Sequence, residues 1–153
     1  MSNTKLDSEA FLERTLEKMD DCDYETALKD INIGIELDPN DPGLLYGRGH
    51  IKICLEDYEG AIEDLSSAIK LDSSEPVYFF YRGLANKELL NYKSALKDYK
   101  SAIHLDSSEA NYFFYRALLY FGLGFKDYEN AIKDLNKAIN LNCKVGDYFY
   151  WRG

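Results

Sequence analysis

The chain has 153 residues, of which 46% are hydrophobic, and this is enough to bury the core of one ordinary domain. Its formal net charge of -9 opposes the basic surfaces that bind nucleic-acid phosphates or anionic lipids, so we expect no nucleic-acid partner. Because it has no apolar run long enough to span a bilayer, and MSNTKLD does not resemble a signal peptide, we expect no membrane insertion and a cytoplasmic location.

Residues 1–7 are polar and are predicted to be disordered. A helical segment then precedes DYETALKDINIGIELD at residues 23–38, and this motif returns as DYEGAIEDLSSAIKLD, NYKSALKDYKSAIHLD and DYENAIKDLNKAINLN. The motif tyrosines Tyr24, Tyr58, Tyr92 and Tyr128 give steps of 34, 34 and 36 residues. We expect the two extra residues of the last step, near Phe125 and Lys126, to enlarge one loop between helices.

Each motif has the apolar spacing of one helix face, as in Ala61, Leu65, Ala68 and Ile69. The segment before each motif is also helical in period. Breaks rich in Asp, Asn, Ser and Pro follow the motifs at residues 38–42, 72–74, 106–108 and 142–144. Each repeat is therefore predicted to be helix, turn, helix, turn.

This pattern resembles the tetratricopeptide repeat, in which bulky residues, Gly or Ala recur at fixed steps. The matching residues are Phe11, Thr15, Ala27, Ile31 and Gly34, with Pro39; Leu45, Gly49, Ala61, Leu65 and Ala68; Phe79, Gly83, Ala95, Tyr99 and Ala102; and Phe113, Ala117, Ala131, Leu135 and Ala138. The resemblance implies an all-α fold, a right-handed α-solenoid. Its repeats would span 8–41, 42–75, 76–109 and 110–145, with the start of a fifth repeat or a capping helix at 146–153.

Small residues allow two helices to approach closely. We therefore expect Gly49, Gly83 and Ala117 to face Ala61, Ala95 and Ala131 across the helical hairpins.

An aromatic block opens the first helix of three repeats, as YFFYRG at 78–83, YFFYRA at 112–117 and YFYWRG at 148–153. In the family, first helices line a concave surface. The resemblance therefore implies an apolar, aromatic groove formed by Tyr46, His50, Ile53, Val77, Phe80, Tyr81, Leu84, Phe114, Tyr115, Leu118 and Phe121. These rings either bind a partner or fill the superhelix under a further segment. The first interpretation agrees with the rule that large exposed apolar stripes mark binding surfaces.

The function that the resemblance implies is a non-catalytic scaffold that binds a peptide or helix of another protein in this groove. The alternative is a self-assembling structural repeat protein, a homo-oligomer whose groove or ends pack on other copies.

No residue constellation indicates catalysis, a metal or a cofactor. His50 and His104 have no metal-ligand spacing, and acidic residues around Asp23 are expected to cap a helix. The odd number of cysteines, Cys22, Cys54 and Cys143, favours free thiols.

An arginine precedes the small residue of each first helix, and an aspartate recurs with the same steps in each second helix. We expect a structural charge ladder that pairs each aspartate with the arginine of the next repeat. The expected pairs are Asp30 with Arg48, Asp64 with Arg82, Asp98 with Arg116 and Asp134 with Arg152, which leaves Arg14 without a partner. Pairing inside each repeat is the alternative.

Family members that bind the acidic tails of heat-shock chaperones use Lys and Asn on their first helices. The corresponding positions here hold Leu12, Leu16, Gly47, Val77 and Tyr81, so we do not expect such tails to bind.

Overall fold

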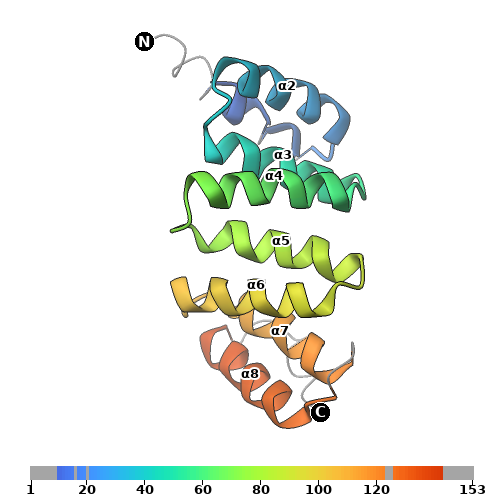
Figure 1. Cartoon of the computed structure of the whole chain (residues 1–153), viewed down its shortest axis with the longest axis vertical. Helices are drawn as coiled ribbons and strands as arrows, with labels where there is room; N and C mark the ends of the chain where they lie inside the picture. The colour runs from blue at the N-terminus through green and yellow to red at the C-terminus, as the bar shows by residue number, and fades with distance from the viewer. Residues whose placement is uncertain (1–9, 16, 20, 123–125, 143–153) are drawn as a thin grey trace. The chain divides into compact units, whose positions relative to one another are not determined.

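The computed structural model describes residues 10–15, 17–19, 21–122 and 126–142, and within these ranges it contains helices and no β-strand. Residues 10–15 and 17–19 are helical. The helices that follow are α2 (Tyr24–Leu37), α3 (Pro42–Cys54), α4 (Tyr58–Leu71), α5 (Pro76–Glu88), α6 (Tyr92–Leu105), α7 (Ala110–Phe121) and α8 (Tyr128–Leu141) (Figure 1). The predicted disordered segment 1–7 and the predicted helix at 146–153 lie outside the described residues.

The helices form helical hairpins, with the most extensive packing inside the pairs α3 and α4, α5 and α6, and α7 and α8. The first helices of three predicted repeats begin at Pro42, Pro76 and Ala110. The connection between α7 and α8 is longer than the corresponding connections of the two preceding hairpins, as the two extra residues predict. The chain divides into two compact units, Met1–Ser74 and Glu75–Gly153, and each is described by itself below.

Among the described residues, each turn inside a hairpin contains one non-glycine residue in the left-handed region. They are Cys22, Glu56, Leu90 and Lys126, with φ between 48° and 62°. After α5, the Leu90 amide donates to the Lys87 carbonyl and the Asn91 amide donates to the Asn86 carbonyl. This is the hydrogen-bond pattern of a Schellman motif, which satisfies the last carbonyls of the helix and sets the direction of the next one.

Aspartate side chains cap most of the second helices. Asp23 accepts from the Thr26 amide, and Asp57 and Asp127 accept from the equivalent amides of α4 and α8. The expected capping role of Asp23 is therefore confirmed, since such a cap pairs a backbone donor that the helix leaves unsatisfied.

Small residues bring the paired helices into contact, and Gly49 faces Ala61 as predicted, but the atoms nearest to Gly49 and Gly83 belong to large side chains. A Cβ added at Gly83 would lie 2.6 Å from Cε1 of Tyr99, so it is the tyrosine ring, rather than Ala95, that requires glycine there. A Cβ at Gly49 would lie 2.8 Å from Cγ of Leu65 and 3.4 Å from the Ala61 carbonyl oxygen. The hairpin is therefore closed by a large side chain lying over a glycine.

The charge ladder is formed inside each hairpin. In the third repeat, Arg82 Nε donates to Asp98 Oδ2 at 3.0 Å and Arg82 Nη2 donates to Asp98 Oδ1 at 2.7 Å. Asn86 adds a hydrogen bond to the same carboxylate at 3.2 Å. The equivalent pairs within one hairpin are Arg14 with Asp30, Arg48 with Asp64 and Arg116 with Asp134.

The predicted pairing between repeats, including Asp98 with Arg116, is therefore wrong, as is the expectation that Arg14 lacks a partner. The physical reason is proximity, because α5 and α6 of one hairpin pack more extensively than α6 packs on α7. Arg152 lies outside the described residues.

Candidate functional site

Seven of the predicted groove residues are accessible on α5 and α7 of the second unit, and we call this set the α5–α7 face. On it, Phe121 is 41% exposed and the others are half-buried. The face comprises Val77, Tyr81 and Leu84 of α5 and Phe114, Tyr115, Leu118 and Phe121 of α7. These side chains remain accessible because α5 and α7 direct other residues, such as Gly83 and Ala117, against their hairpin partners.

Phe80 is the exception, and its prediction as a groove-lining residue is wrong. It is 8% exposed and belongs to the core of the second unit. Its ring centroid lies 4.9 Å from that of Tyr112, 5.4 Å from that of Tyr115 and 5.9 Å from that of Tyr99. The Phe80 ring is enclosed by Tyr99 of α6 and Tyr112 of α7. It therefore lies in the core and packs against Tyr115 of the α5–α7 face.

The ring cluster fixes the aromatic side chains of the face. Tyr115 contacts Phe80 and Phe114 with ring planes at 70° and 79°, and the Lys87 ammonium lies 5.7 Å from the centroid of the Tyr115 ring. Edge-to-face rings and a cation over a ring are both favourable arrangements. Sequence analysis missed Lys87, although it lies three residues after Leu84 and so falls on the same side of the helix.

The core beneath the face holds tyrosines in their neutral form. Burial raises the pKa of Tyr112 to about 12, and burial also raises the pKa of Tyr99. The Tyr99 hydroxyl is buried and has no hydrogen-bond partner among the described residues. The cluster is therefore suited to packing rather than to proton transfer.

The other three predicted groove residues, Tyr46, His50 and Ile53, lie on α3 in the first unit and are half-buried. The rings of Tyr46 and His50 are stacked, with centroids 6.2 Å apart. Burial lowers the pKa of His50 below its ordinary value of 6.5, so the imidazole is neutral near pH 7. Whether these residues continue the α5–α7 face in one groove stays a prediction.

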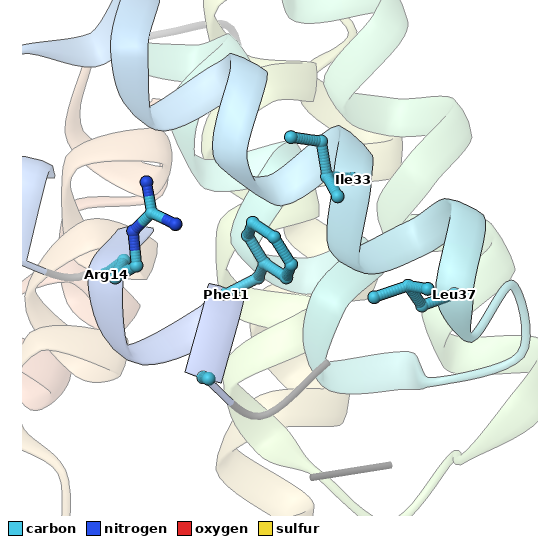
Figure 2. Close-up of a pocket in the computed structure, with 5 residues that line it drawn as sticks. Phe11, Arg14, Ile33 and Leu37 are labelled. Carbon is cyan, nitrogen blue, oxygen red and sulfur yellow. The ribbon is translucent and has the colours of Figure 1, made fainter. Parts of the chain in front are cut away.

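A hollow that sequence analysis did not identify lies elsewhere in the first unit. It is lined by Ala10, Phe11 and Arg14 of the first helical segment and by Ile33 and Leu37 of α2 (Figure 2). Its residues have helical spacing on both segments, but sequence alone gave no sign that a space remains between them.

Within the described residues, no group of three or more His, Cys, Asp or Glu side chains is placed to hold a metal ion. Cys22 and Cys54 are free thiols, and Cys143 lies outside the described residues. None of the helices in the described part of the chain combines the length and the apolar character needed to cross a membrane.

The fold is that of an all-α repeat protein built from helical hairpins, as predicted. A family model described as tetratricopeptide repeat matches residues 42–75 and 114–142. Residues 42–75 and 114–142 therefore carry the sequence pattern of the tetratricopeptide repeat. Comparison with curated proteins gives no significant match.

Several solved structures share the fold. PilF of Pseudomonas aeruginosa has a TM-score of 0.89 at 17% identity, over 99% of this chain and 68% of PilF. MamA of Desulfovibrio magneticus RS-1 has a TM-score of 0.79 at 18% identity, over 92% of this chain and 78% of MamA. The first tetratricopeptide repeat of Spaghetti (RPAP3), bound to the HSP90 peptide SRMEEVD, has a TM-score of 0.75 at 21% identity, over 77% of this chain and 94% of that one. At these identities the likeness is one of fold.

Proposed function

We propose that the protein is a non-catalytic interaction scaffold whose α5–α7 face binds an apolar peptide or helix of a partner protein. The observation that carries the proposal is the set of accessible apolar side chains on α5 and α7, with Phe114, Leu118 and Phe121 along α7. An apolar surface of this kind favours burial against a partner.

The nature of the side chains supports a protein ligand. Aromatic residues carry a large share of the binding energy at protein interfaces, and the rings of Tyr81 and Tyr115 already pack against the cluster around Phe80. A partner would therefore pay little conformational entropy to order them. The tetratricopeptide repeat match agrees with this proposal, because such repeats commonly act as interaction scaffolds.

A peptide library displayed on phage, selected against the protein, provides the ligand for the test. The affinity of a selected peptide is measured for the wild type, for Phe114→Ala combined with Leu118→Ala, and for Leu105→Ala. Leu105 is 41% exposed on α6 and lies outside the face, so it is the matched control. We expect the double variant to lose about 2 kcal/mol, roughly thirtyfold in affinity, and the control to bind like the wild type. Selected peptides that bind the double variant equally well would contradict the proposed site.

Self-assembly is the alternative, and one observation favours it. Phe121, Tyr128 and Ile132 are 41%, 52% and 48% exposed, and the rings of Phe121 and Tyr128 are in contact. Light scattering over about a hundredfold range of protein concentration distinguishes the two functions, because association follows mass action. A molar mass that stays at that of one chain at every concentration contradicts self-assembly. A molar mass that rises with concentration in the wild type, but stays at that of one chain in Tyr128→Ser, contradicts a purely partner-binding role.

A further inference from the structure

The hollow in the first unit is open to solvent and is lined mainly by apolar side chains. Its volume is about 410 Å³, within the range of ligand pockets, and it lies between the first helical segment and α2. Figure 2 shows the Phe11 ring between Arg14 on one side and Ile33 and Leu37 on the other. Ile33 is 42% and Leu37 is 38% exposed, so these apolar side chains are accessible from solvent.

Arg14 differs from the other ladder arginines. Its ion pair with Asp30 is a single contact, Nη2 to Oδ1 at 3.2 Å, whereas Arg48, Arg82 and Arg116 each hold their aspartate with two nitrogens. The Arg14 side chain is 57% exposed, against 24%, 21% and 17% for those three. Among the described residues this is the one hydrogen bond that Arg14 makes. The other N–H groups of the Arg14 guanidinium therefore have no hydrogen-bond partner among the described residues, and they lie at the edge of the hollow.

The aspartate is also incompletely paired. Asp30 is 6% exposed, and its Oδ2 has no hydrogen-bond partner in the described part of the chain. The equivalent oxygen of Asp64 receives both Arg48 Nε and the ammonium of Lys52. The first pair is thus held less tightly than its counterparts, and Arg14 lies turned toward the Phe11 ring, with its guanidinium carbon 5.3 Å from the ring centroid.

Ile33 is the part of the apolar wall that is specific to the first repeat. The position of Ile33 is occupied by Ser67, Ser101 and Lys137 in the later repeats. In the fourth repeat, the Lys137 ammonium lies 6.0 Å from the centroid of the Phe113 ring, where it covers the equivalent of Phe11. Ile33 therefore provides an apolar surface at a place where the other repeats have polar side chains.

We propose that this hollow binds an aliphatic side chain of a partner protein that has a single carboxylate beside it. The aliphatic group contacts Phe11, Ile33 and Leu37, and the carboxylate accepts hydrogen bonds from Arg14, whose planar donors suit a carboxylate. The chain's net charge of -9 opposes a run of acidic residues, so one carboxylate next to an apolar group is the better complement. The site is in the first unit and does not depend on the α5–α7 face.

The test uses N-acetyl-L-leucine as the probe, titrated into the whole protein while backbone amide NMR signals are recorded. N-acetyl-L-leucinamide removes the charge and N-acetylglycine removes the aliphatic side chain. We expect saturable shifts at residues 10–14 and 33–37, with a dissociation constant that is roughly millimolar for a ligand of this size. Each control ligand should bind at least about fivefold more weakly than N-acetyl-L-leucine. Shifts spread over the whole chain, no saturation, or equal binding of the amide would overturn the proposal.

Two variants separate the two parts of the site. Ile33→Ser introduces the residue that the chain has at the equivalent positions 67 and 101. It should weaken the binding of N-acetyl-L-leucine and leave the thermal stability close to that of the wild type. Arg14→Met should abolish the preference of the protein for N-acetyl-L-leucine over N-acetyl-L-leucinamide. Lys97 is exposed on α6, so Lys97→Met is the control for the loss of one positive charge. Unchanged binding in Ile33→Ser contradicts the assigned site even if Arg14→Met is too unstable to measure.

Discussion

Arg82 and Asp98 face each other across one helical hairpin, and their two hydrogen bonds, at 3.0 Å and 2.7 Å, join the side chains in a fork. Asp98 is 3% exposed, so its charge depends on this arginine and on Asn86 for compensation. A buried carboxylate that loses its partner is strongly destabilising, whereas an exposed pair contributes little. The ladder is therefore a structural element whose members differ in their importance.

Arg82→Met should lower the free energy of unfolding by about 3 kcal/mol, because it leaves Asp98 buried and uncompensated. Arg14→Met should cost less than Arg82→Met, since it removes one hydrogen bond of 3.2 Å from a side chain that is 57% exposed. Urea unfolding measures both. A double-mutant cycle of Arg82 and Asp98 should show coupling above roughly 0.5 kcal/mol, and the cycle of Arg116 and Asp98 should be additive. The reverse result would support pairing between repeats.

The repeat spacing predicted which arginines and aspartates form the ladder, but it did not predict which arginine pairs with which aspartate. Arg48, Arg82 and Arg116 each have an aspartate at a similar distance before and after them. Spacing alone therefore could not decide whether the pairs form within a repeat or between repeats. The choice depends on which helices pack more closely, and that depends on side chains such as Tyr99 lying over Gly83. For the same reason the burial of Phe80 could not be predicted, because the rings that enclose it come from α6 and α7.

Gly83→Ala should destabilise the protein by about 1 to 3 kcal/mol, because the new Cβ would lie 2.6 Å from Cε1 of Tyr99. Tyr99→Leu in the same chain should recover part of this loss. The fourth repeat already combines Ala117 with Leu135 at these positions, so the pair of side chains is compatible with the hairpin. Thermal unfolding of both single variants and the double variant measures the coupling, and strict additivity would show that the contact is not tight.

The repeat period and the small residues predicted the hairpins, but the turns at residues 20–23, 55–57 and 89–91 contain no glycine to mark them. Their left-handed residues are of ordinary type, as at Leu90, where φ is 61°. A non-glycine residue in this region costs roughly 1–2 kcal/mol. The turn is retained because its two backbone hydrogen bonds pair carbonyls at the end of α5.

Leu90→Gly should therefore raise the free energy of unfolding by up to about 1 kcal/mol, since glycine adopts the left-handed region without the steric cost but loses more chain entropy. Leu90 is 68% exposed, so little packing is lost. Leu89→Gly, at a position with φ of -79°, is the matched control and should lower stability. Chemical denaturation of the two variants checks the sign, and a loss in Leu90→Gly would mean that the Leu90 side chain contributes packing.

His50 should make the protein sensitive to mild acid. Its folded pKa lies below 6.5, so the unfolded chain binds the proton more readily than the folded chain. The stabilising contribution of the neutral imidazole is therefore complete above pH 6.5 and is lost as the pH falls from 6.5 toward the lower folded pKa. The melting temperature of the wild type should fall more steeply over this range than that of His50→Gln. His104→Gln, on the exposed surface of α6, should keep the wild-type slope, and equal slopes in all three proteins would exclude a role for His50.

The peptide SRMEEVD, which is bound by the first tetratricopeptide repeat of Spaghetti, should not bind this protein with micromolar affinity. The positions that correspond to the Lys and Asn residues of tail-binding family members include Gly47, Val77 and Tyr81, which offer no cationic side chain to a terminal carboxylate. The net charge of -9 also repels an acidic peptide at long range. Isothermal titration of SRMEEVD and of the same peptide with an amidated C-terminus gives the measurement. Micromolar binding that is lost on amidation would show that the first helices hold a carboxylate, and it would contradict an apolar ligand as the occupant of this surface.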